Sequence, residues 1–148
     1  MASIKRFEDI VAWQKARDLS KKIYKISSTG TLSKDIGLRE QARRSSVSIM
    51  ANIAEGYERK TDKEFVRFLN ISKGSLAELK SHLYLAKEVD YITVKLLNEL
   101  LSECDEISKI LSGLINYLKK ERTKKRNTSI HPNTKPIDSR LKTKDSRL

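Results

Sequence analysis

Apolar residues recur every three or four positions through four long stretches of this chain, a spacing typical of amphipathic α-helices. We expect helices over residues of about 8–28, 36–57, 62–89 and 94–120. Short connections place successive helices antiparallel, so the sequence predicts an all-α, up-down-up-down four-helix bundle. The third stretch shows the clearest seam, with intervals of four and three: Phe65, Leu69, Ser72, Leu76, Leu79, Leu83 and Ala86.

Helix ends can be placed from short polar motifs. "TDKE" has the pattern of a capping box, in which the Thr61 side chain caps the third helix and Glu64 reaches back. Asn52 and Glu55 come near the end of the second helix and are expected to be exposed or to hold the following turn. Gly56 is expected to end that helix, because glycine adopts a positive φ most easily. We therefore assign these five residues structural roles.

The second and fourth helices carry apolar residues over an unusually wide arc. A surface helix needs an apolar stripe of about 100°, and both stretches exceed that width. The second helix also has small residues that allow helices to approach closely, namely Ala42, Ser45, Ser46, Ala51 and Ala54. One interpretation is a monomer with a tightly packed core and a wide apolar margin around that core. The interpretation we favour is self-association, because extended apolar patches usually mark interfaces.

Charge is distributed unevenly along the chain. The net charge is +12, and residues 121–148 hold nine lysines and arginines against three acidic residues, which is half of the excess. This segment contains both prolines and repeats "DSRL", but it has no periodic apolar face. The sequence therefore predicts one domain over residues 1–120 and a disordered basic tail over residues 121–148.

A strongly basic chain favours polyanionic partners, although lysine-rich faces also serve solubility alone. Arginine and lysine at intervals of four residues form a stripe on the first helix, and three arginines lie in the first part of the second, namely Arg39, Arg43 and Arg44. No recognition-helix motif or aromatic RNA platform is visible, so phosphate contacts would dominate any binding to RNA or DNA. The candidate contacts are Arg17, Lys21, Lys25, Arg43, Arg44, Lys124, Lys125 and Arg126.

Signals of catalysis are missing from the sequence. Cys104 is the single cysteine, and His82 and His131 have no metal-ligand spacing around them. No Glu-x-x-His pair, phosphate-cradling glycine loop or nucleophile–base pair appears. We expect no enzyme activity, no cofactor and no metal. Because no signal peptide or apolar run of about 20 residues is present, we also expect a cytoplasmic protein without membrane binding.

Several motifs occur in an order that resembles a known family. They are "FEDIVAWQKA" at residues 7–16, "RRSSVSIMANIAEG" at 43–56, "EFVRFLNISKGSLAEL" at 64–79 and "GLINYLKK" at 113–120. Together they resemble the 23S rRNA intervening-sequence proteins, also called the four helix bundle protein family, and the tail falls outside the match. The resemblance implies a bacterial antiparallel bundle that assembles as a homopentamer. It implies no catalytic residues.

Two functions fit these observations. The first is a non-enzymatic, oligomeric accessory or scaffold protein that binds nucleic acid through its basic surface. The alternative is a protein-interaction module that does not bind nucleic acid directly. The resemblance suggests a reverse transcriptase or a ribosomal component as the partner in that case.

Overall fold

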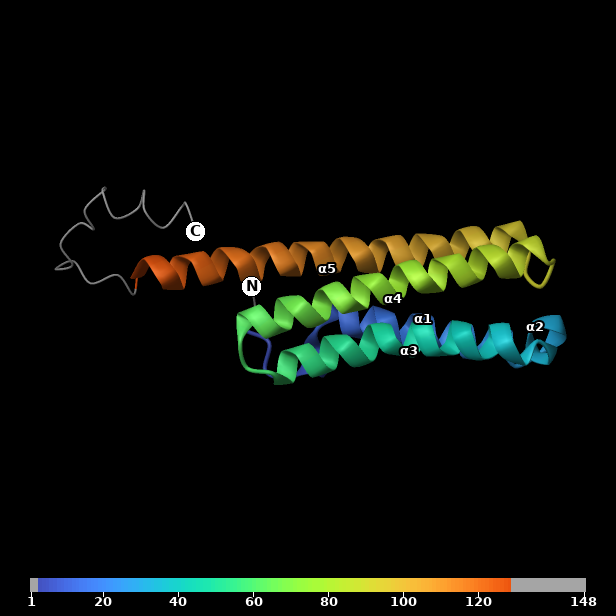
Figure 1. Ribbon diagram of the computed structural model, residues 1–148, viewed down its shortest axis with the longest axis horizontal. Coiled ribbons are helices and arrows are strands. Elements are labelled where there is room, and N and C mark those ends of the chain that lie inside the picture. Colours follow the sequence, from blue (N-terminus) through green and yellow to red (C-terminus); the bar gives the residue numbers. More distant parts are fainter. Residues whose placement is uncertain (1–2, 129–148) are drawn as a thin grey trace, which may run out of the picture.

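A computed structural model describes residues 3–128 of this chain and shows an all-α bundle of four main helices side by side (Figure 1). The main helices are α1 (Val11–Ser27), α3 (Ile36–Glu58), α4 (Asp62–Glu88) and α5 (Val94–Thr128). A 3-10 turn, η1 (Phe7–Asp9), precedes α1, and the short helix α2 (Gly30–Lys34) joins α1 to α3. The four-helix fold class predicted from the spacing of apolar residues is confirmed.

The four main helices close a ring around one core. α3 packs against α1 and α4, and α5 packs against α4 and α1. The apolar face of each helix points inward, and the most buried large side chains come from all four: Leu19, Ile23, Ile49, Ile53, Leu69, Leu76, Leu79, Leu83, Leu100, Ile107 and Leu111. The wide apolar arc of α5 is largely used within this ring, because Leu96, Leu101, Ile110 and Leu114 pack half-buried against the core.

α3 and α4 approach each other closely, as the small residues of α3 predict. The Ser72 hydroxyl of α4 donates to the backbone carbonyl of Ile49 in α3 at 2.9 Å, and both residues are buried. The hydroxyls of Ser48 and Ser75 lie 2.8 Å apart across the same interface. The side-chain amide of Asn52 donates to the Ser48 carbonyl and hydroxyl, at 2.8 and 3.0 Å. Asn52 is therefore half-buried beside this contact.

Gly56 does not end α3, so the predicted role of this residue is wrong. α3 continues to Glu58, and the positive φ of 68° belongs to Lys60 in the connection to α4. Gly56 is a buried helical residue, and a Cβ atom there would lie 2.6 Å from the Cβ of Phe68. This position needs glycine because α4 passes too close for any side chain. Glu55 is exposed and pairs with Arg59 at 3.0 Å.

Polar side chains hold the first turns of α3 and α4. The Thr61 hydroxyl accepts from the backbone N–H of Glu64 at 3.2 Å, whereas the Glu64 carboxylate pairs with Arg67 at 3.1 Å. Asp35 caps α3 by accepting from the N–H of Leu38 at 3.1 Å. The other Asp35 oxygen accepts from the phenol of Tyr91, also at 3.1 Å. Tyr91 thereby ties the α4–α5 connection to the start of α3.

α5 extends further than the sequence predicts. Its helix runs to Thr128, so residues 121–128 are not part of a disordered tail. The last buried residue is Leu118, and the helix then projects beyond the ends of α3 and α4 (Figure 1). Apolar spacing stops at Leu118, which explains the short prediction, but most of the following residues have good helix propensity. Residues 129–148 of the predicted tail lie outside the described residues.

Candidate nucleic-acid interface

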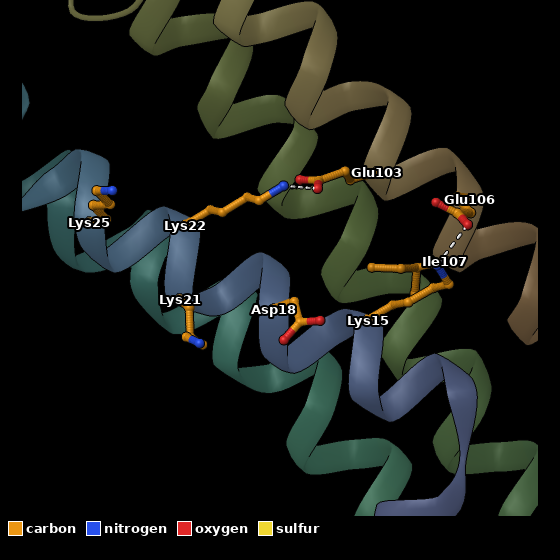
Figure 2. A pocket seen from close by; sticks show the side chains of 8 residues that line it. All are labelled: Lys15, Asp18, Lys21, Lys22, Lys25, Glu103, Glu106 and Ile107. Carbon is orange, nitrogen blue, oxygen red and sulfur yellow. Dashed lines mark hydrogen bonds and ion pairs between the residues drawn. The ribbon is translucent and has the colours of Figure 1, made fainter.

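The basic residues of α1 surround a groove between α1 and α5. Ala12, Ala16, Leu19 and Ile23 fix the orientation of α1 because they are buried in the core, which leaves its lysines at the surface. The groove has a volume of about 470 Å³ (Figure 2). Its lining combines four lysines with three carboxylates and one apolar side chain: Lys15, Asp18, Lys21, Lys22, Lys25, Glu103, Glu106 and Ile107.

Two of these lysines are bound to acidic residues of α5. The Lys15 ammonium lies 2.9 Å from the Glu106 carboxylate, and Lys22 donates to Glu103 (Figure 2). The hydrogen bond to Glu106, together with the charge of that carboxylate, raises the pKa of Lys15. Exposed ion pairs stabilise a fold only slightly. Their main effect here is to balance the positive charges of Lys15 and Lys22. The spacing of residues within α1 alone does not reveal this pairing.

Lys21 and Lys25 have no such partner. Both are exposed, and neither forms an ion pair within residues 3–128. Lys21 points away from α5, whereas Lys15 and Lys22 reach toward it (Figure 2). One helical turn separates Lys21 from Lys25, so their charges repeat along the surface of α1. These two lysines are the members of the predicted stripe that form no ion pair in the described part of the chain.

Arg17, the third member of the stripe, is exposed but does not line the groove. Its Nε atom lies 3.4 Å from the carboxylate of Asp18, and its guanidinium lies 5.3 Å from the centre of the Trp13 ring. The ring restricts the arginine to the outer surface of α1 without burying it. Arg17 remains accessible to an anion there.

The two arginines of α3 differ in their surroundings. Arg43 donates from Nε to the Ser27 hydroxyl at 2.8 Å and from Nη2 to the Ser28 hydroxyl at 3.1 Å. Its guanidinium also lies 4.6 Å from the ring centre of Tyr24, so it ties α3 to the end of α1. Arg44 is exposed and forms no ion pair within the described residues. Only the tertiary packing of α1 on α3 could show this difference.

The three basic residues at the end of α5 lie apart from the groove. Lys124 pairs with Glu121 and Lys125 pairs with Asp62, both at 3.4 Å, and Arg126 is exposed. At ~1.5 Å per residue, Lys124 lies about 25 Å along α5 from the groove residue Ile107. The eight predicted contacts therefore form at least two separate basic surfaces, one on α1 and one at the end of α5.

Cysteine and histidine each occur once in the described part of the chain. Cys104 is fully buried, and this burial raises the pKa of its thiol to about 12. His82 is half-buried, with Nε2 at 3.6 Å from the Glu78 carboxylate. Within residues 3–128, no three His, Cys, Asp or Glu residues gather where they could hold a metal ion. None of the helices in this range has the length and apolar character of a bilayer-spanning segment.

Comparison with known proteins places the chain in a family. Residues 8–113 match the family described as 23S rRNA-intervening sequence protein, and the chain belongs to this family. One solved structure that it resembles is a protein of unknown function from the S23 ribosomal protein family of Bacteroides thetaiotaomicron VPI-5482. The two share 26% sequence identity with a TM-score of 0.67, over 72% of this chain and 96% of the other. No curated protein matches the chain.

Proposed function

We propose that this protein is a non-enzymatic, self-associating helical bundle that binds nucleic acid and acts as an accessory or scaffold factor. The observation that carries this proposal is the pair of exposed lysines on α1, Lys21 and Lys25, which have no carboxylate partner within residues 3–128. They stand beside Lys15 and Lys22, which already pair with Glu106 and Glu103 of α5. Phosphate groups are the natural partners of unpaired, repeating cations.

Binding through these lysines would be tolerant of sequence. Phosphate contacts position a protein on a nucleic acid, but they carry no information about the bases. The described surface offers no aromatic platform at the groove, because its lining holds only charged residues and Ile107. We therefore expect weak affinity for each subunit, increased by the repetition of the site in an oligomer.

Self-association is supported by side chains on α3 and α4. Half of the large apolar residues that stay exposed within residues 3–128 lie there, including Ile36 at 65%, Val47 at 38%, Ile71 at 40% and Leu85 at 52%. Where such residues form one contiguous patch, the patch is typical of a surface that is covered in an assembly. On α5, Val94 and Tyr117 are also exposed, at 55% and 41%, whereas the half-buried apolar residues of this helix already pack on the core. The proposed number of five subunits comes from the family resemblance alone.

The same apolar residues favour a second candidate function. A protein partner, such as a reverse transcriptase or a ribosomal component, would cover Val47 and Ile71 in place of another copy of the chain. In that case the lysines of α1 would serve solubility, and the protein would be an interaction module without direct nucleic-acid binding.

Binding of purified protein to mixed-sequence RNA and DNA oligomers separates these functions. The measurement should be made at ~50 mM salt, where electrostatic attraction is strong. Nucleic-acid binding predicts a complex with both oligomers that weakens as salt is added. If neither oligomer binds under these conditions, the nucleic-acid proposal fails and the protein-partner function takes its place.

A further inference from the structure

The projecting end of α5 differs from every other basic surface of the described chain. After Leu118, which is 8% exposed, no residue up to Thr128 is buried, and only Glu121 is even half-buried. This ten-residue segment spans about 15 Å at ~1.5 Å per residue. It carries six cations and one acid, and we call it the basic arm: Lys119, Lys120, Arg122, Lys124, Lys125 and Arg126, with Glu121.

Cations surround the basic arm on all sides. At ~100° per residue, no arc wider than about 100° lacks a lysine or arginine. The α1 lysines differ, because the buried face of α1 confines them to the outer side of that helix. When cations lie on all sides of a helix, a flat anionic surface or a single phosphate backbone can contact only some of them. Such a helix matches an environment with phosphates on two opposite sides.

The major groove of B-form DNA provides that environment. It is about 12 Å wide and admits an α-helix, whose diameter with side chains is about 10–12 Å. The major groove of A-form RNA is deep and narrow, and its minor groove is wide and shallow. The first is too narrow to admit a helix, and the second is too shallow to place phosphates on two opposite sides of one. We propose that the basic arm enters the major groove of double-stranded DNA, a specific inference that rests on the proposed nucleic-acid function.

Contacts with the bundle direct the basic arm. Lys125 pairs at 3.4 Å with Asp62, in the first turn of α4, which links the arm to the end of the bundle. Positive charges in the last turn of a helix also interact favourably with its macrodipole. Lys125 keeps 73% of its side-chain surface exposed, so this pair leaves the ammonium open to a phosphate. The basic arm can therefore reach a groove without displacing any buried side chain.

The test compares the full-length protein with two variants of equal charge. The arm variant carries Lys120→Gln, Arg122→Gln and Lys124→Gln, since glutamine keeps a good helix propensity. The control variant carries Lys34→Gln, Lys95→Gln and Lys109→Gln, which remove three exposed lysines from the bundle itself. Circular dichroism checks that both variants keep the helical fold. The probes are a mixed-sequence DNA duplex of about 20 base pairs, its separate strands and the RNA duplex of the same sequence, since both grooves must be compared.

We expect the unmodified protein to bind the DNA duplex more tightly than the single strands or the RNA duplex. The arm variant should lose this preference, while the control variant keeps it. For three lost phosphate contacts, the slope of log K against log salt on the DNA duplex should fall by about 2.7. Equal affinity of the unmodified protein for all three probes would overturn the inference, and so would equal losses in both variants. In either case an acidic protein becomes the better partner for the basic arm. The proposed function stands, because it rests on the lysines of α1. Absence of binding to every probe would remove the proposed function as well.

Discussion

Gly56 of α3 lies so close to Phe68 of α4 that a Cβ atom on the glycine would come within 2.6 Å of the phenylalanine Cβ. The ring of Phe65 limits the same space, at 3.1 Å. Both aromatic residues are buried, so neither can swing into solvent to make room. The contact sets the distance between the two helices at the end of the bundle where α3 connects to α4.

Replacing Gly56 with alanine should therefore destabilise the protein. Alanine favours a helix over glycine by about 1 kcal/mol, but crowding a packed core typically costs about 1–3 kcal/mol. Gly74 provides the matched control, because it is exposed within α4 and a Cβ atom there would meet no other atom within 4 Å. Gly74→Ala should stabilise the protein by about 0.5–1 kcal/mol. Thermal unfolding of both variants measures the difference, and a stabilising Gly56→Ala change would contradict the close contact.

The spacing of apolar residues is sufficient to predict the four main helices. The starts of α3, α4 and α5 match the predicted bounds, and the other bounds differ by one to three residues, except that α5 ends eight residues later than predicted. The role of Gly56 could not be predicted, because it depends on Phe68 from another helix. α2 escapes prediction since its five residues are too short to show periodicity. The extension of α5 escapes prediction because it buries no apolar side chain after Leu118.

The candidate site is only partly predictable. Spacing within α1 correctly places Lys21 and Lys25 on its surface, because the apolar residues of the same helix define the opposite face. The neutralisation of Lys15 and Lys22 depends on which helix packs beside α1, and the sequence alone does not assign Glu103 and Glu106 to them. The hydrogen bonds from Arg43 to Ser27 and Ser28, at the end of α1, depend on packing in the same way.

The hydrogen bond from Tyr91 to Asp35 should stabilise the bundle at the end opposite Gly56. Asp35→Ala removes both the cap of α3 and this hydrogen bond, and loss of a cap alone costs about 1 kcal/mol. Tyr91→Phe removes only the hydrogen bond and should have a smaller effect. In the Asp35→Ala background, Tyr91→Phe should have almost no further effect on unfolding. An unchanged effect there would show that the two side chains are not coupled.

This hydrogen bond also predicts a dependence on pH. Bonding to Asp35 raises the pKa of the Tyr91 phenol above its ordinary value of 10.0. A group whose pKa is raised by folding stabilises the folded state below its unfolded pKa, and this stabilisation is lost as the pH rises through the folded pKa. The stability difference between the natural protein and Tyr91→Phe should therefore be constant near pH 8 and shrink above about pH 10. A difference that grows with alkaline pH would contradict this assignment.

Cys104 should be unreactive in the folded protein. Burial raises the pKa of its thiol from 9.0 to about 12, so only about one molecule in ten thousand carries a thiolate at pH 8. A thiol-specific reagent should label the native protein very slowly and the denatured protein quickly, at one equivalent per chain. Equal labelling rates in the two states would mean that α5 does not bury this residue.

Self-association predicts a mass well above that of one chain. A pentamer of 17.0 kDa subunits would have a mass of about 85 kDa in light scattering. A double change of Val47→Glu and Ile71→Glu should reduce this mass, because it places charges on the exposed apolar surface of α3 and α4. Val94→Glu, on the exposed first residue of α5, is the control and should leave the mass unchanged. A mass of one subunit at micromolar concentration would contradict the assembly.

The most direct test of the account is the salt dependence of duplex DNA binding by a charge-reversed α1. Lys21→Glu and Lys25→Glu together alter the two groove lysines that form no ion pair within residues 3–128, and Lys34→Glu with Lys95→Glu makes the same charge change at exposed sites outside the groove. If α1 neutralises two phosphates, the first variant should lower the slope of log K against log salt by about 1.8, and the control should leave it nearly unchanged. Equal slopes for both variants would contradict the claim that α1 binds phosphate.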